Sequence, residues 1–503
     1  MSETYDYIIA GGGTAGCVLA ARLSERADVS VLLLESGPRD TKPELSIPPV
    51  WVNLWDTEVD EPYQTEPQTA QDGLVHDWHR GHTLGGGSSI NGMIFLRGHR
   101  NDFDSWGALG AVGWAWNDVL PYFQRLETVP GGDPTVRGTD GPMRPAPSAT
   151  PNALSQVFID AAASLGNPIT PNFNGHLQEG VGWHELSITG GFRQSAAVAY
   201  LHPAESRSNL TVSTDSRATR LLMSGNRVTG VQFRRDGAQV EAPALREVIV
   251  SSGSLESPRL LLLSGVGPAD GLRGAGIDVR HDLPGVGRNL HDHPLTSVVF
   301  EAERPIADGL TNHAESSMLW RSDPGLAGPD MQLLFAHVPY HLPHRQAPPN
   351  SFTLSVTVTP RSRGSVSLRD ASPDTAPVVD PRYLSDSSDL DRLVEGVKVA
   401  REVAAARPFD GWRGKEVLPG ANDTSRAALE AFVRRGTGTY HHPVGTCAMG
   451  TGDHSVVSPQ LRVHGVAGLR VVDASIIPKI GCVNTNATVT MIAERAADII
   501  TGA

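Results

Sequence analysis

Cysteine is nearly absent from this chain, which has three (Cys17, Cys447 and Cys482) among its 503 residues. Three thiols cannot build a disulfide framework, and their spacing matches no metal-ligand pattern. Long apolar runs are also missing, since no stretch reaches the roughly 18–20 apolar residues that a membrane span needs. The N-terminal stretch lacks the basic and apolar segments of a secretory signal. These absences predict a cytoplasmic protein without a membrane span.

Positive charge is in short supply as well. The chain has 42 Lys and Arg against 55 Asp and Glu, a net charge of −13. This negative charge would repel phosphates, so we expect no nucleic-acid partner. A solvated acidic surface is enough to explain the net charge. Apolar residues make up 39% and charged residues 19%, values ordinary for a globular protein. The length exceeds what one hydrophobic core serves, which favours two domains.

Glycine is plentiful, and the first glycine cluster lies between a predicted strand and a predicted helix. Residues 5–10 predict a short buried strand, in which residues 7–10 are an apolar run, and residues 11–16 read G-x-G-x-x-G. Residues 17–25 then predict a helix, and residues 29–34 predict a second strand. This strand–loop–helix–strand order is the context in which the glycine pattern binds a dinucleotide.

Each position of this loop has a physical role. Gly11 permits the tight turn, Gly13 lets the backbone approach a pyrophosphate, and Gly16 allows close helix–strand packing. The free N–H groups of the helix start would face the phosphates. Glu35, directly after the second strand, is placed to accept hydrogen bonds from the adenosine ribose. The unit predicts dinucleotide binding but leaves NAD and FAD equally open.

A second glycine–serine loop, residues 81–92, would let backbone N–H groups approach a planar or anionic ligand. The amino-acid sequence of this loop resembles the first motif of the glucose–methanol–choline (GMC) oxidoreductases. The resemblance continues in the family's order through five further segments, residues 97–104, 113–123, 253–267, 283–294 and 469–478. The chain is thus similar to this family over almost its whole length.

The resemblance implies an α/β fold, α+β overall, with two parts. A Rossmann-like FAD-binding domain would be assembled from residues 1–150, 195–297 and 440–503. A substrate-binding domain with an antiparallel sheet and flanking helices would comprise residues 151–194 and 298–439. The sequence of the second part agrees, because residues 330–336 and 351–359 predict strands. Residues 388–404 predict a helix.

The resemblance also implies which residues contact FAD. In this family the 85–91 loop lies against the isoalloxazine, and the position of Asp473 lies near the ribityl–pyrophosphate. With the residues of the first loop, the implied contacts are Gly11, Gly13, Thr14, Ala15, Gly16, Glu35, Gly86, Ser89, Asn91, Gly92, Ala218, Asp473, Ala474, Asn484 and Thr485. Relatives that bind FAD covalently use a histidine where this chain has Ile90. We therefore expect non-covalent FAD.

Residues 439–450 resemble the family's histidine motif, in which His442 aligns with the catalytic base. Asn486 is taken as its partner, in the segment before a predicted helix at residues 487–500. Oxidising an alcohol removes a hydroxyl proton and a hydride from one carbon. Histidine suits the first task because its pKa lies near working pH. Asn486 would hold the substrate oxygen. The N-terminus of the last helix would stabilise the anionic reduced flavin.

Several further residues are candidates for the substrate pocket. His441 and Tyr440 precede the catalytic histidine; His441 either shapes the pocket entrance or packs. Trp51, Trp55 and Tyr63 would line an aromatic pocket or belong to the core. His337, His341 and His344 have a helical spacing, but Pro339 and Pro343 argue against a helix. We therefore expect no metal site at these three histidines.

The sequence thus predicts oxidation of a primary alcohol, aromatic or otherwise activated, to its aldehyde. The electron acceptor is oxygen or a quinone or carrier, and the alcohol itself stays open. Two alternatives from other reaction classes also exist in the family: a non-redox hydroxynitrile lyase with an idle flavin, and a light-driven fatty acid decarboxylase. No carboxylate stands out as a partner for the cation of choline.

The position of Ile90 yields a first test. Since its side chain cannot bond to the flavin, acid or heat denaturation of the purified protein should release all FAD into the supernatant. The intact polypeptide should then have the mass of 503 unmodified residues. Flavin absorbance that stays with the precipitated protein would contradict non-covalent binding.

Overall fold

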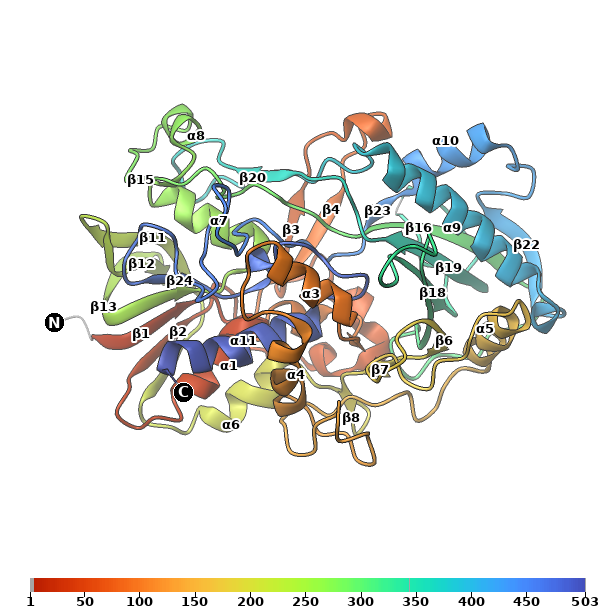
Figure 1. The fold of residues 1–503 in the computed structure, drawn as a ribbon, viewed down its shortest axis with the longest axis horizontal. Coiled ribbons are helices and arrows are strands. Elements are labelled where there is room, and N and C mark those ends of the chain that lie inside the picture. Colours follow the sequence, from red (N-terminus) through yellow and green to blue (C-terminus); the bar gives the residue numbers. More distant parts are fainter. Residues whose placement is uncertain (1–3, 343, 503) are drawn as a thin grey trace.

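Two seven-stranded sheets, each with its own helices, lie side by side in the computed structural model (Figure 1). The structure describes residues 4–342 and 344–502. Two expectations, on the N-terminal stretch and on Pro343, rest partly on residues outside these ranges. Both ends of the chain lie at the first sheet, on the left in Figure 1. Within the described ranges, no helix is long and apolar enough to cross a lipid bilayer.

The first sheet is parallel at its centre and antiparallel at one side. Its order is β10 (Leu210–Ser213), β2 (Val31–Leu34), β1 (Tyr5–Ala10), β13 (Ala238–Val250), β12 (Arg227–Arg235) and β11 (Ser216–Ser224), and β24 (Leu469–Val471) also pairs with β13. The pairs of β1 with β2 and with β13 are parallel. A parallel sheet is covered on both faces, which explains why residues 7–10 of β1 and the whole of β2 are apolar and buried.

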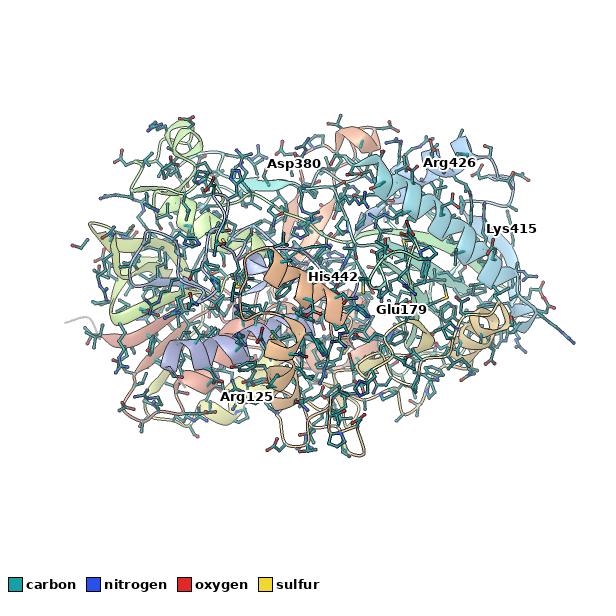
Figure 2. All side chains as sticks on the ribbon, in the orientation of Figure 1. Arg125, Glu179, Asp380, Lys415, Arg426 and His442 are labelled. Carbon is teal, nitrogen blue, oxygen red and sulfur yellow. The ribbon has the colours of Figure 1, made fainter. Side chains whose placement is uncertain are left out.

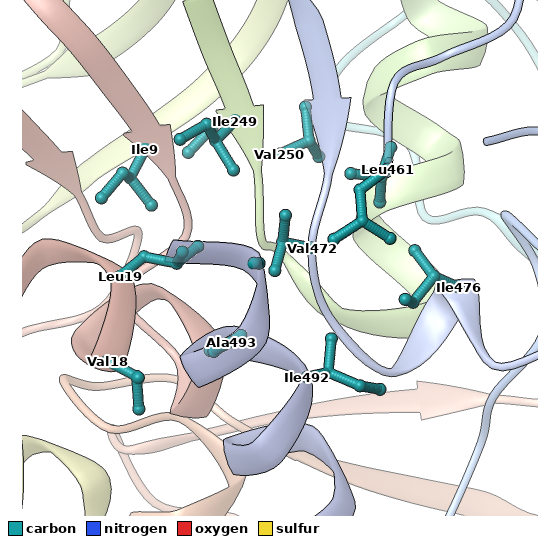
Figure 3. Close-up of a cluster of buried hydrophobic side chains, with 14 of the residues drawn as sticks. Ile9, Val18, Leu19, Ile249, Val250, Leu461, Val472, Ile476, Ile492 and Ala493 are labelled. Carbon is teal, nitrogen blue, oxygen red and sulfur yellow. The ribbon is translucent and has the colours of Figure 1, made fainter. Parts of the chain in front are cut away.

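Helices α1 (Thr14–Leu23) and α11 (Asn486–Thr501) pack against each other beside this sheet. Figure 3 shows how Leu19 of α1 and Ala493 of α11 meet Ile9 and Ile249 from the strands. These four side chains are fully buried. Other helices of the molecule are α2 (Gly87–Ile90), α3 (Arg100–Ala108), α4 (Trp116–Arg125), α6 (His202–Ala204), α7 (Gly253–Leu263) and α8 (Ala269–Gly274).

The second sheet is antiparallel and lies on the right in Figure 1. Its order is β22 (Arg413–Leu418), β16 (Pro294–Ala302), β19 (Ser351–Val358), β18 (Met331–Ala336), β17 (Ser316–Trp320) and β6 (Gly180–Trp183), and β23 (Gly438–Thr439) also pairs with β16. It packs against α5 (Ala153–Ser164) and α9 (Ser387–Ala405), and α10 (Arg426–Gly436) contacts α9. Both faces are covered, so every residue of β19 is buried.

A β-hairpin and a short 3₁₀ helix carry residues of the site described below. The hairpin consists of β3 (Asp60–Gln64) and β4 (Asp77–Gly81), and the 3₁₀ helix spans Pro48–Leu54. Short two-stranded pairs elsewhere are β5 (Ile94–Phe95) with β7 (Glu185–Leu186), β8 (Ile188–Thr189) with β9 (Phe192–Arg193), β14 (Val266–Gly267) with β15 (His281–Asp282), and β20 (Ser365–Ser367) with β21 (Val378–Asp380).

The expected fold class is confirmed: a Rossmann-like part and an antiparallel-sheet part, both built from separate chain segments. Element ends differ slightly from expectation, since α1 begins at Thr14 rather than Cys17. The boundary expected at residues 297–298 falls inside β16, because this strand runs unbroken from Pro294 to Ala302. The assignment of residue ranges to two domains stays a prediction.

A buried charge network joins the chain after α4 to β7. The guanidinium of Arg137 donates to Glu127 at 2.6 Å and to Glu185 at 2.7 and 2.8 Å. Arg97 also pairs with Glu127 at 2.6 Å. All four side chains are buried. Removing one partner of such a network leaves a buried charge without a counter-charge, in surroundings of low polarity.

Arg137→Met should therefore lower the free energy of unfolding by about 3–5 kcal/mol, because it leaves the carboxylates of Glu127 and Glu185 short of a cation. Urea denaturation followed by circular dichroism measures this. Arg273→Met, which removes an exposed pair with Asp270, serves as the control and should leave stability unchanged. Equal effects of the two substitutions would contradict the role of the network.

Candidate active site

A cavity of about 580 Å³ is lined by residues of both sheets and of the loops between them. Its size lies within the usual range for small-molecule and cofactor sites. Figure 2 labels His442 near the middle of the molecule, between the two sheets. The side chain of this histidine lines the cavity.

The first turn of α1 opens onto this cavity. Gly11 has a φ of 111°, and a Cβ there would come within 2.5 Å of the Ser251 carbonyl oxygen. Only glycine fits such a position. Gly13, Thr14 and Ala15 line the cavity, and no side chain within residues 4–342 and 344–502 caps the helix start. Its free N–H groups are therefore available for an anion such as a diphosphate.

A second helix N-terminus faces the same cavity. Helix α11 begins at Asn486, and both Thr485 and Asn486 line the cavity. The side-chain amide of Asn486 donates to Thr14 Oγ1 at 3.1 Å and so joins the starts of α11 and α1. Two helix N-termini at one place provide partial positive charge for a bound anion.

Glu35 lies at the end of β2 and lines the cavity, as its expected role at a ribose requires. Its two carboxylate oxygens also hold the surrounding loops. Oε2 accepts from Gly12 N at 2.8 Å, and Oε1 accepts from Gly37 N at 2.8 Å. Burial raises the pKa of this carboxyl, while the two backbone donors act in the opposite direction.

Most of the expected FAD contacts line the one cavity, although they come from distant parts of the chain. They are Gly11, Gly13, Thr14, Ala15, Glu35, Gly86, Asn91, Gly92, Ala218, Asp473, Ala474, Asn484 and Thr485. Gly16 and Ser89 do not line it. A Cβ at Gly16 would meet the Gly11 carbonyl oxygen at 1.9 Å, and the Ser89 hydroxyl donates to the Leu84 carbonyl at 2.7 Å. These two residues shape the loops instead.

His442 is held through its backbone and through both ring nitrogens. Its backbone N–H donates to Asp292 Oδ1 at 2.6 Å. Its Nδ1 lies 3.0 Å from Nδ1 of His293, and its Nε2 lies 3.2 Å from the amide nitrogen of Asn484. Burial, with smaller contributions from His293, His441 and Arg80, holds the pKa of His442 well below its usual range. At neutral pH the ring is therefore uncharged and keeps a lone pair on one of its nitrogens.

The structure brings Asn484 rather than Asn486 next to the ring of His442, and the catalytic role expected for Asn486 stays a prediction. Asn484 approaches the imidazole, whereas Asn486 binds Thr14. The reason is that Asn486 is already the first residue of α11, which packs against α1. Asn484 precedes the helix and presents its amide to His442.

His441 and Tyr440 both line the cavity, as expected for substrate-pocket candidates. His441 has a φ of 62°, a left-handed conformation that is uncommon for a residue with a side chain. Its ring contacts Trp55, with ring centroids 5.2 Å apart, whereas the Tyr440 ring lies 4.3 Å from that of His442. The side chains of Tyr440 and His441 therefore lie against different parts of the cavity wall.

Aromatic rings form part of the cavity wall. Trp51 and Trp55 line the cavity and meet edge to face, with centroids 5.5 Å apart. Tyr340 lies 6.4 Å from Trp51, and His79 stacks on Trp55 at 4.5 Å. Tyr63 also lines the cavity, but its hydroxyl donates to Glu256 at 2.9 Å. The pocket interpretation of the two tryptophans therefore holds over core packing.

Three residues beside His442 received no role from the sequence: Arg80, Asp292 and His293. Arg80 donates to the His441 carbonyl at 2.9 Å. Asp292 accepts from the hydroxyl of Thr439 at 2.6 Å and from that of Tyr383. Asp292 and His293 belong to the segment 283–294 noted for its family resemblance, but that resemblance does not reveal what they contact.

His337, His341 and His344 do not converge. His337 is buried beside His313, with ring centroids 5.4 Å apart. His341 bonds to the Leu342 carbonyl at 2.8 Å, and His344 bonds to the Arg435 carbonyl at 3.0 Å. The three rings have separate backbone or ring partners.

The cavity has room for a dinucleotide such as FAD at the loop backbone and extends from there to His442. A Cβ at Gly13 would meet Gly86 Cα only at 3.9 Å, so this backbone is open to close approach by a ligand. The cavity continues from the helix N-termini to the His442 ring and the aromatic wall. A dinucleotide site that reaches a histidine is the arrangement of an oxidoreductase with a nicotinamide or flavin cofactor.

Comparisons with known proteins agree with this class. Residues 5–295 and 360–493 match the two sequence profiles of the GMC oxidoreductases. Human mitochondrial choline dehydrogenase is 40% identical, over 99% of this chain and 90% of the relative. The oxygen-dependent choline dehydrogenase of Sinorhizobium fredii is 39% identical, over 99% and 95%. Pyridoxine 4-oxidase from Mesorbium loti superposes with a TM-score of 0.96 at 35% identity, over 99% and 100%.

The chain belongs to the GMC oxidoreductase family. It is an FAD-dependent enzyme that oxidises CH–OH donors, and its substrate is a small alcohol.

Two glycines of the first loop provide a test of the cofactor site. Gly13→Ala adds a methyl group where protein atoms leave room, so the fold should persist while FAD affinity falls at least about 10-fold. Flavin fluorescence titration of the apoprotein measures this loss. Gly16→Ala instead drives Cβ into the Gly11 carbonyl and should lower thermal stability. An unchanged FAD affinity in Gly13→Ala would contradict the assignment of this loop.

Proposed function

We propose that this enzyme oxidises a neutral, aromatic or otherwise activated primary alcohol to its aldehyde, with His442 as the base. The observation that carries the proposal is the neutral His442 ring at the cavity, with Nε2 beside the Asn484 amide. Asn484 takes the role that the sequence suggested for Asn486.

The proposed residues divide the reaction between them. The substrate hydroxyl lies beside His442 Nε2 and the Asn484 amide and replaces their direct hydrogen bond of 3.2 Å. It gives its proton to Nε2 and accepts a hydrogen bond from the amide. Asn484 thereby stabilises the oxygen as charge develops on it, an effect worth about 2.7–4 kcal/mol where such a donor is well placed. The guanidinium of Arg80 near His441 adds positive charge for the same oxygen. FAD, when bound, accepts the hydride from the carbinol carbon.

The cavity residues support particular positions for the cofactor. The two helix starts, at Thr14 and Thr485, would hold its diphosphate, and Glu35 would hold its adenosine ribose. The turn at Gly86 to Gly92 offers backbone N–H groups to the isoalloxazine.

Charge in the cavity favours a neutral substrate over choline. Within residues 4–342 and 344–502, its acidic lining residues are Glu35, Glu61, Glu256 and Asp473. Each already has donors: Glu61 accepts from Arg217 at 2.6 Å, Glu256 accepts from Arg259 at 2.8 Å, and Asp473 accepts from Gly253 N at 2.8 Å. A quaternary ammonium would therefore find no uncommitted carboxylate. Trp51 and Trp55 offer faces on which an aromatic ring can stack. The same faces would attract a quaternary ammonium through cation–π contacts, so the preference for a neutral substrate rests on the carboxylates alone.

We further propose oxygen as the electron acceptor. Pyridoxine 4-oxidase, formate oxidase and an aryl-alcohol oxidase are among the similar solved structures, at 35%, 26% and 25% identity. A quinone or protein carrier is the alternative acceptor. The lyase and decarboxylase alternatives gain no support, since the relatives named here are dehydrogenases and oxidases.

An anaerobic titration of the flavin absorbance tests both the substrate class and the base. Benzyl alcohol and pyridoxine should bleach the flavin, and choline at equal concentration should not. In His442→Ala with FAD bound, the rate of bleaching should fall about 10²–10⁴-fold because the proton acceptor is gone. His176→Ala removes an exposed ring and serves as the control with an unchanged rate.

Undiminished bleaching in His442→Ala would overturn the assignment of the base, and faster bleaching by choline would overturn the substrate class. Admitting air then distinguishes the acceptors. Rapid return of the colour supports oxygen, whereas slow return that an added quinone accelerates identifies a dehydrogenase.

A further inference from the structure

His293 is a fully buried histidine whose ring contacts the ring of His442. It directly precedes β16, and its ring stands nearly perpendicular to that of His442, with centroids 5.2 Å apart. Its Nε2 lies 2.7 Å from the carbonyl oxygen of Gly481, and its Nδ1 lies 3.0 Å from Nδ1 of His442. The ring thus bridges a backbone carbonyl and the proposed base.

The carbonyl determines which nitrogen of His293 carries the proton. A carbonyl oxygen only accepts hydrogen bonds, so Nε2 of His293 must be the donor to Gly481. Burial lowers the pKa of His293 to about 4, so the ring holds a single proton at neutral pH. Its Nδ1 therefore has a free lone pair directed at His442.

The proton position on His293 also determines that on His442. Because Nδ1 of His293 is an acceptor, Nδ1 of His442 must donate across the 3.0 Å contact. The neutral His442 ring then has its lone pair on Nε2. The amide nitrogen of Asn484, 3.2 Å away, is a donor and requires a lone pair at that same atom. Two separate contacts therefore select one tautomer.

We propose that His293 is a positioning residue that fixes His442 in the tautomer protonated at Nδ1, so that Nε2 receives the proton of the alcohol. This rests on the proposed function, in which His442 is the base.

The hydrogen-bond chain also serves the state after proton transfer. The O–H bond of the alcohol breaks, the proton forms a bond to Nε2, and His442 becomes a cation that still donates from Nδ1. The neutral His293 accepts this now charge-assisted hydrogen bond without moving its own proton. Burial, Arg80 and any positive charge on His293 or His441 disfavour the His442 cation. Neutral His293 instead offers this cation a lone pair.

Two substitutions separate the hydrogen bond from mere packing. His293→Leu keeps the site filled but removes the acceptor, which leaves His442 free to adopt the other tautomer. His293→Gln retains a donor for Gly481 and an acceptor for His442. The rate constant of anaerobic flavin reduction should fall about 10–100-fold in His293→Leu. In His293→Gln it should stay within about 3-fold of the unmodified enzyme, and the apparent Kd for the alcohol should change little in either variant.

His291 supplies a matched control. It is buried in the same segment, and its Nδ1 bonds to the Asn289 carbonyl at 2.6 Å while its Nε2 accepts from Ile480 N at 2.9 Å. His291→Leu therefore loosens the same part of the chain without touching His442. An equal loss of rate in His291→Leu and His293→Leu would overturn the proposal, and so would equal losses in His293→Leu and His293→Gln with FAD bound.

Neutron diffraction from deuterated holoenzyme tests the tautomers without any substitution. Deuterium on His442 Nδ1 and His293 Nε2 is the expected result. Deuterium on His442 Nε2 instead would overturn the proposal, even if His293→Leu fails to fold. The two failures are distinguishable, because full activity in His442→Ala rejects the base itself, whereas full activity in His293→Leu alone rejects only its positioning.

Discussion

Direct contact between backbones from distant parts of the chain is the constraint on which the site depends. A Cβ at Gly11 would lie 2.5 Å from the Ser251 carbonyl oxygen, and one at Gly86 would lie 2.7 Å from Gly13 Cα. Glycine at these positions lets the turn after β1, the loop before α2 and the end of β13 meet. The starts of α1 and α11 then open into the same cavity as His442. Any larger side chain would separate these segments.

Low polarity is the second property of the site. Burial keeps the pKa of His442, His441 and His293 below the usual range, so three neighbouring imidazoles remain uncharged. Neutral rings can be acceptors, which a base for an alcohol requires. Asp292 and Arg80, two charged groups beside this site, are held by neighbouring polar groups rather than directed at the base nitrogen. In the described part of the chain, the chemistry therefore depends on hydrogen-bond direction more than on an ion pair.

Local patterns predicted much of this structure because they act over a few residues. The apolar run of β1, the glycine turn and the helix behind it follow from side-chain size and backbone freedom alone. The partner of His442 did not follow in this way. Asn484 and Asn486 carry identical side chains two residues apart, and which of them faces His442 depends on where α11 begins and how it packs against α1. A sequence pattern carries no information about that register.

By itself, the sequence determined the dinucleotide loop, the family, the cofactor and the identity of the candidate base, because short motifs of fixed spacing carry each of them. Only the tertiary structure decided what surrounds that base. His293 lies 149 residues before His442, and Asn484 lies 42 residues after it. These contacts form because the two sheets and the last helix pack around one cavity, so the hydrogen bonds that select the reactive nitrogen exist only in the folded chain.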